Sequence, residues 1–178
     1  ARVAKAMGMD VMAYDPYVSA ERAQQMQVRL LPLPALFAEA DFVSLHLPRT
    51  PDTENLVNAE LLKTMKSTSR IVNCARGGII DEAALAEAVE NGTIGGAALD
   101  VYAKEPLEAD LPLRQVKERL ILTPHLGAST EEAQENVAID VAEQIRDVLL
   151  GLPARSAVNI PGLNAEVMEQ LKPHLQLA

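Results

Sequence analysis

Aromatic residues are nearly absent from this sequence. Its 178 residues include no tryptophan, three tyrosines and two phenylalanines, although 48% of them are hydrophobic. The core must therefore consist mainly of alanine, valine, leucine and isoleucine. This composition is typical of parallel strands that are buried on both faces by helices, and the length fits one ordinary domain.

Cysteine is almost as scarce. The single residue, Cys74, cannot form a disulfide within the chain, which favours a reducing compartment such as the cytoplasm. The histidines and the cysteine also lack the close spacing of a metal site, so we expect no metal.

Basic residues and long apolar runs are lacking too. Sixteen lysines and arginines face 25 aspartates and glutamates, giving a net charge of -9. Without a basic patch, neither nucleic acid nor an anionic membrane is an expected partner. No apolar run reaches the roughly 18 residues that a membrane span requires.

Short apolar segments alternate with helical patterns along the chain. Side-chain caps at Ser19, Asn58 and Asp81 mark three helix starts. The expected strands are 10–14, 41–47, 70–75, 94–101 and 119–123, and the expected helices are 1–7, 19–27, 33–40, 58–66, 81–91 and one from Ser129 or Thr130 to 150. This alternation predicts an α/β fold with a Rossmann-type, doubly wound parallel sheet.

The chain divides into three expected regions. Residues 1–124 form a partial dinucleotide-binding domain, and residues 125–152 form a long helix that closes it. Residues 153–178 form a linker and a short amphipathic helix near 164–176, which we assign to a further domain. The opening residues resemble the middle of a helix, so we expect the sequence to be truncated.

Polar residues follow the predicted strands at their carboxyl ends. They are Asp15, His46, Arg76, Asp100 and His125. Ligands of open parallel α/β sheets bind at this edge, so we expect these side chains to surround one site.

Asp15 is the most informative of these residues for a cofactor. An acidic residue that ends the second strand of a dinucleotide fold binds the adenosine ribose, and it would repel a 2′-phosphate. The sequence therefore favours NAD over NADP, although Asp15-Pro16 could also be a simple turn. The glycine-rich loop expected about 20 residues earlier, and the first strand, would precede residue 1.

Four motifs carry a resemblance to a known family. They are HLPRTPDT at 46–53, NCARGG at 73–78, LDVYAKEP at 99–106 and TPHLGAS at 123–129. In their order and their residues they closely resemble motifs of the D-isomer-specific 2-hydroxyacid dehydrogenases, and the resemblance covers nearly the whole chain. The resemblance implies NAD-dependent oxidation of a D-2-hydroxy acid.

Within that family, the sequences of these motifs are most similar to those of members that oxidise D-3-phosphoglycerate in the first step of L-serine biosynthesis. Members acting on glyoxylate, hydroxypyruvate or D-lactate are the enzymatic alternative, and an NAD-sensing transcriptional corepressor is the non-enzymatic one. The resemblance also implies a homodimer or homotetramer. On its own, this chain is expected to be inactive.

Three residues would carry the chemistry. By the resemblance, His125 is the general base that takes the hydroxyl proton, and Glu105 orients its ring and stabilises its protonated form. The planar guanidinium of Arg76 matches a substrate carboxylate, and Gly77-Gly78 leave room for substrate. Taken singly, these residues could be a packed histidine, a solvated loop acid and a surface arginine.

The resemblance also implies a set of cofactor contacts. Asp100 would bind the nicotinamide carboxamide, and His46 could instead have a purely structural role. The full set is Asp15, His46, Leu47, Pro48, Cys74, Ala75, Arg76, Asp100, His125, Gly127 and Ala128.

Overall fold

The computed structural model describes residues 1–116, 118–127, 129–152 and 154–155. The chain forms two compact units, 1–126 and 127–178. Most of the expected linker, the helix near 164–176 and Ala128 lie outside the described residues.

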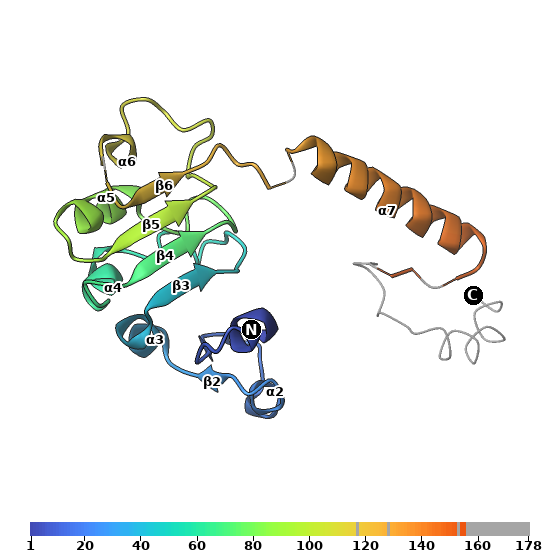
Figure 1. Cartoon of the computed structure of the whole chain (residues 1–178), viewed down its shortest axis with the longest axis horizontal. Coiled ribbons are helices and arrows are strands. Elements are labelled where there is room, and N and C mark those ends of the chain that lie inside the picture. Colours follow the sequence, from blue (N-terminus) through green and yellow to red (C-terminus); the bar gives the residue numbers. More distant parts are fainter. Residues whose placement is uncertain (117, 128, 153, 156–178) are drawn as a thin grey trace. The chain divides into compact units, whose positions relative to one another are not determined.

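A parallel four-stranded sheet is the centre of the first unit. Its strands are β3 (Phe42–Leu45), β4 (Arg70–Asn73), β5 (Gly96–Leu99) and β6 (Leu120–Leu122), and they lie side by side in chain order (Figure 1). Leu45 pairs with Asn73, and Asn73 pairs with Leu99, so the carboxyl ends of three strands meet at one edge. The predicted parallel sheet is confirmed.

A second, two-stranded sheet precedes it. Strand β1 (Met12–Ala13) pairs in parallel with β2 (Arg29–Leu30). Between them, helix α2 (Ala20–Gln25) begins at Ser19, whose side chain accepts a hydrogen bond from the Arg22 backbone N–H. The predicted Ser19 cap is therefore confirmed.

The remaining helices of this unit begin as their sequences indicate. Asn58 caps α4 through the Leu61 N–H, and Asp81 caps α5 through the N–H groups of Ala83 and Ala84. The helices are α1 (Arg2–Ala6), α3 (Leu33–Glu39), α4 (Ala59–Lys63), α5 (Glu82–Glu90) and α6 (Pro112–Gln115).

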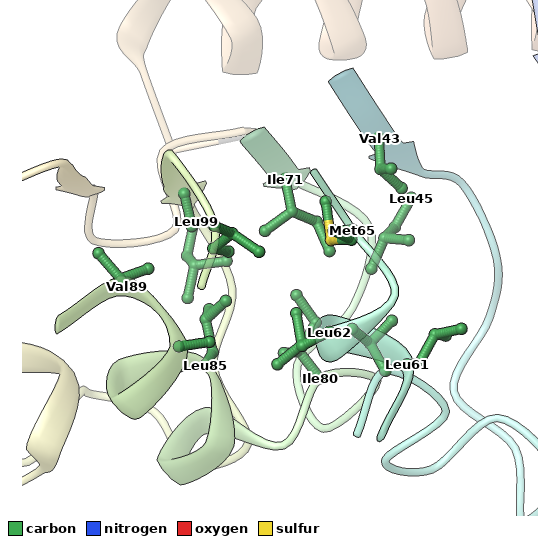
Figure 2. Packing of buried hydrophobic residues seen from close by; sticks show 14 of the residues in the cluster. Val43, Leu45, Leu61, Leu62, Met65, Ile71, Ile80, Leu85, Val89 and Leu99 are labelled. Carbon is green, nitrogen blue, oxygen red and sulfur yellow. The ribbon is translucent and has the colours of Figure 1, made fainter. Parts of the chain in front are cut away.

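The core lies between one face of the four-stranded sheet and helices α4 and α5. Ile71 and Leu99 lie on the strands, and Leu62 and Leu85 lie on the helices opposite them (Figure 2). All four are almost fully buried. The predicted aliphatic core is confirmed, and Phe37 is the one phenylalanine buried in it.

The other face of the sheet differs from the expectation. Along β3, Phe42 and Ser44 are exposed while Val43 and Leu45 are buried. Phe42 is 61% exposed and Ile121 of β6 is 65% exposed. The helices of this unit therefore leave these two side chains uncovered, because the core residues of α4 and α5 pack on the Val43 side.

Two elements were not predicted. Strand β2 has only two residues and is followed closely by Pro32, so it shows no alternation. Helix α6 is a single turn that begins at a proline.

The second unit begins at Gly127 and contains helix α7 (Glu131–Leu149). Thr130, rather than Ser129, provides the cap by accepting from the Ala133 N–H. Within the described ranges, no helix is both long and apolar enough to cross a membrane.

Candidate active site

The imidazole of His125 and the carboxylate of Glu105 meet beyond the ends of β5 and β6. His125 Nδ1 and Glu105 Oε2 lie 2.7 Å apart and form a hydrogen-bonded pair. The histidine side chain is 49% exposed and the glutamate side chain 35%, so both groups can be reached from solvent. The structure brings these two predicted residues together.

Two groups hold the Glu105 carboxylate in place. Its second oxygen, Oε1, accepts a hydrogen bond of 3.0 Å from the Tyr102 backbone N–H. The hydrogen bond with His125, followed by that with Tyr102, lowers the pKa of Glu105. The carboxylate therefore stays ionised into the acid range.

The backbone of His125 has an unusual conformation. Its φ of 56° lies in the left-handed region, which costs a residue other than glycine about 1–3 kcal/mol unless its surroundings impose it. Asp100 supplies one such constraint, because its Oδ1 accepts from the Leu126 N–H at 2.9 Å and from Thr123 Oγ1 at 2.5 Å. Asp100 therefore fixes the chain on both sides of His125.

Tyr102 joins the ends of β5 and β6. Its buried hydroxyl lies 2.7 Å from the Thr123 carbonyl oxygen and 3.1 Å from that of Leu99. Burial is the main cause that raises the pKa of this phenol. Tyr102 was not predicted as a site residue, because a sequence motif does not show which backbone groups a tyrosine hydroxyl will reach.

Glu82 also supports the loop that carries Glu105. From the first turn of α5, its Oε1 accepts from the Ala103 N–H at 2.6 Å. Burial, only partly offset by that hydrogen bond, raises the pKa of Glu82, and the nearby charges of Asp81 and Glu105 add to the rise. The consecutive N–H groups of Tyr102 and Ala103 are thus held by two different carboxylates.

Arg76 lies on the turn after β4, where its guanidinium donates to the Ala75 carbonyl at 2.6 Å. The turn is pressed against the Glu105 loop, because a Cβ on Gly77 would stand 1.6 Å from the Tyr102 carbonyl oxygen. The structure therefore places the Arg76 backbone beside the loop of the Glu105–His125 pair. Direct convergence of its guanidinium on that pair stays a prediction.

A cleft of about 400 Å³ opens beside the pair. Its lining includes Tyr102, Glu105, Leu107, Arg114 and His125. A larger hollow, of about 520 Å³, lies over α2 and β2 and contains none of the predicted catalytic residues. We therefore take the smaller cleft as the candidate site.

The predicted adenosine contacts follow two strands that belong to different sheets. Asp15 follows β1 and is exposed, and its Oδ1 accepts from the Tyr17 N–H at 2.9 Å in an Asx turn. His46 follows β3, where its Nε2 lies 2.8 Å from Ser44 Oγ. Pro48 is exposed and Leu47 is partly buried.

The predicted nicotinamide contacts follow β4, β5 and β6. Cys74 is exposed and Ala75 is half-buried. Asp100 is half-buried and Gly127 is exposed. Their cofactor roles stay predictions.

The model of the D-isomer specific 2-hydroxyacid dehydrogenase, NAD binding domain, matches residues 1–127. The chain is 66% identical over its full length to the D-3-phosphoglycerate dehydrogenase of Synechocystis sp., of which it covers 32%. It is 46% identical over its full length to that of Archaeoglobus fulgidus, of which it covers 34%. The chain thus spans about a third of the length of these curated relatives.

Solved structures agree with this match. The TT0316 protein from Thermus thermophilus superposes with a TM-score of 0.73 at 36% identity, covering 88% of this chain and 48% of that one. The NAD-complexed D-isomer specific 2-hydroxyacid dehydrogenase from Lactobacillus delbrueckii ssp. bulgaricus gives a TM-score of 0.70 at 32% identity, covering 89% and 51%. With the family model matched over most of its length and the Glu105–His125 pair in place, this chain belongs to the D-isomer specific 2-hydroxyacid dehydrogenases, within their NAD binding domain.

Proposed function

We propose that the full-length protein carrying this chain oxidises D-3-phosphoglycerate with NAD as hydride acceptor. The observation that carries the proposal is the hydrogen bond between His125 Nδ1 and Glu105 Oε2. An ionised carboxylate can only accept, so Nδ1 must carry the hydrogen. In the neutral ring, Nε2 is then left as the basic atom.

The residues of the site fit a hydroxyacid oxidation. His125 Nε2 would take the proton of the substrate hydroxyl, and Glu105 would stabilise the imidazolium that forms. NAD, when bound, supplies the acceptor for the hydride that leaves the carbon bearing that hydroxyl. In the reverse reaction the imidazolium would return its proton to the carbonyl oxygen.

Arg76 would bind the substrate carboxylate. Its guanidinium is exposed on a turn that contacts the Glu105 loop, and its planar donors match a carboxylate in a bidentate manner. Because the turn is pressed against the loop, a substrate held by Arg76 would lie beside His125.

The chain also has the features expected of an NAD site. Exposed polar side chains follow the parallel strands at their carboxyl ends, among them Asp15, His46 and Cys74. One oxygen of Asp15 is engaged by the Tyr17 N–H, and we assign the carboxylate to the ribose hydroxyls. A carboxylate there disfavours a 2′-phosphate, which supports NAD over NADP.

Sequence identity supports D-3-phosphoglycerate over other hydroxy acids. The relatives with that name are 66% and 46% identical over the whole chain. The solved D-lactate dehydrogenases from Treponema pallidum and Escherichia coli are 33% identical over a smaller part.

Steady-state kinetics of the full-length protein test this proposal. We expect the highest kcat/KM with D-3-phosphoglycerate in a panel that includes D-lactate and, with NADH, glyoxylate and hydroxypyruvate. His125→Ala should lower turnover by at least about two orders of magnitude, the typical loss on removing a general base. Preference for another substrate would contradict the substrate assignment, and near-normal turnover of the variant would remove His125 from its role.

We also propose that the protein is a homo-oligomer in a reducing compartment such as the cytoplasm. The exposed Phe42 and Ile121 support an apolar contact surface, and the exposed thiol of Cys74 supports the reducing compartment. Light scattering of the full-length protein tests the oligomer, and a monomeric mass would contradict it. Localising the tagged protein tests the compartment.

A further inference from the structure

Asn73 is a polar residue at a position that favours an apolar one. It ends β4 with 2% exposure, and it pairs with Leu45 and Leu99, which are also buried. Burying an amide costs free energy unless its hydrogen bonds are all made. A role beyond packing would explain an asparagine here.

Both ends of the Asn73 amide bind the segment that leads to Arg76. Oδ1 accepts from the Ala75 backbone N–H at 3.0 Å, and Nδ2 donates to the Arg76 carbonyl oxygen at 3.0 Å. One buried side chain therefore fixes two consecutive residues of the turn. Its own carbonyl accepts from the Asp100 N–H at 3.0 Å, which joins it to the residue that fixes the chain around His125.

The next two residues of the turn are fixed by other loops. Gly77 is pressed against the Tyr102 carbonyl, and the Gly78 carbonyl accepts from the Asn55 N–H at 2.8 Å. Because Asn73 holds Arg76 from the core side, the backbone at Arg76 is constrained from both directions. The direction in which the guanidinium leaves the backbone is then constrained too.

We propose that Asn73 is a positioning residue, whose amide sets the direction in which Arg76 meets the substrate carboxylate. This inference rests on the proposed function, which gives Arg76 that role. The Asn73 side chain is buried, and its amide binds backbone groups of the turn. Its effect on the reaction passes through Arg76.

A double-mutant cycle in the full-length protein tests the proposal. We expect Asn73→Ala to lower kcat/KM by roughly 10- to 100-fold, as when a binding group is displaced by about 1 Å. The loss should come mainly from a higher KM for the hydroxy acid, because the amide acts through the position of Arg76. In an Arg76→Ala background, Asn73→Ala should cause little further loss.

Ser69→Ala is the matched control. Ser69 is the other buried polar residue of the described chain, it precedes the opposite end of β4, and its hydroxyl donates to the Ala40 carbonyl at 2.6 Å. It should lower the melting temperature comparably without changing the KM for the hydroxy acid. Asn73→Asp keeps the acceptor for Ala75 but loses the donor to Arg76, so it should also raise that KM.

The outcomes separate failure of the proposed function from failure of the positioning role of Asn73. If the unaltered protein oxidises no 2-hydroxy acid, the proposed function fails. If it is active but the Asn73 and Arg76 losses multiply, or KM does not change, the positioning role fails alone. Failure of both Asn73 variants to fold, while Ser69→Ala folds, would also count against it by showing a purely structural residue.

Discussion

The tautomer of the His125 ring is set by the carboxylate that accepts a hydrogen bond from its Nδ1. Glu105 binds Nδ1 at 2.7 Å, and its own position depends on the Tyr102 N–H. A glutamine at residue 105 would have nearly the same shape, but its amide could donate to Nδ1 as well as accept from it. Donation would stabilise the tautomer in which Nε2 carries the hydrogen and cannot act as a base.

Glu105→Gln should therefore lower kcat by about 10²- to 10⁴-fold in the full-length protein, as in other acid–histidine pairs. The Kd for NAD should change little. Glu108→Gln offers a control, because Glu108 forms an exposed ion pair with Lys104 on the same loop. A Glu105→Gln enzyme with a normal kcat would show that the carboxylate does not select the tautomer.

The same carboxylate gives a dependence of stability on pH. Its pKa is lowered in the folded protein, so its hydrogen bonds contribute stability above the unfolded value near 4.5 and lose it as pH falls below that. We expect the Glu105→Gln variant to melt below the unaltered protein at pH 7. The gap should narrow as pH falls from the unfolded value through the lowered pKa of the folded protein, and a gap that stays constant over that fall would contradict this assignment.

At this scale the sequence predicted which residues meet, but not what holds them. Glu105 and His125 were identified through their motifs, and the structure joins them. The supporting contacts of Tyr102, Glu82 and Asn73 are made with backbone groups of other loops. No local pattern encodes such contacts, although a polar residue within the apolar strand RIVN was a signal that could have identified Asn73.

Among the elements, the turn after β4 depends most on the absence of a side chain. Gly77 has an ordinary backbone conformation, yet a Cβ there would lie 1.6 Å from the Tyr102 carbonyl oxygen. The obstacle is backbone, so it cannot rotate away. Gly8 is the opposite case, with a left-handed φ of 81° and open space around it.

These two glycines allow a matched comparison in the full-length protein. Gly8→Ala should cost about 1 kcal/mol through backbone conformation alone. Gly77→Ala should cost more, on the order of the 1–3 kcal/mol of overpacking, and it should reduce kcat/KM because the Glu105 loop must move. Thermal unfolding and kinetics measure both effects, and equal stability losses with normal activity would refute the close approach.

The main elements follow from sequence patterns because their signals are local. Ser19, Asn58 and Asp81 cap helices as predicted, since each side chain needs only the next turn of its own chain. Strand β2 is different, because two residues become a strand only through pairing with β1. That partner lies 17 residues away, beyond the reach of a local pattern.

At the scale of the whole molecule, two features were not predicted from the sequence: the division of the strands into a two-stranded and a four-stranded sheet, and the exposed apolar residues on the larger sheet. The composition predicted strands covered by helices on both faces, but composition cannot show which helix packs on which face. In the described chain Phe42 and Ile121 remain mostly exposed on β3 and β6. Exposed apolar surface of this kind marks a site of association or a tendency to aggregate.

The 178-residue chain, prepared alone, should therefore self-associate and bind an apolar dye. A double variant, Phe42→Thr with Ile121→Thr, should reduce both signals, because threonine suits a strand but exposes less apolar surface. Tyr17→Thr is a control at an exposed aromatic outside the sheets. We also expect no dehydrogenase activity from the chain alone, since it spans about a third of its relatives. A monomer that binds no dye would contradict the prediction that Phe42 and Ile121 drive association. Turnover of substrate by the isolated chain would contradict the prediction that the chain alone is inactive.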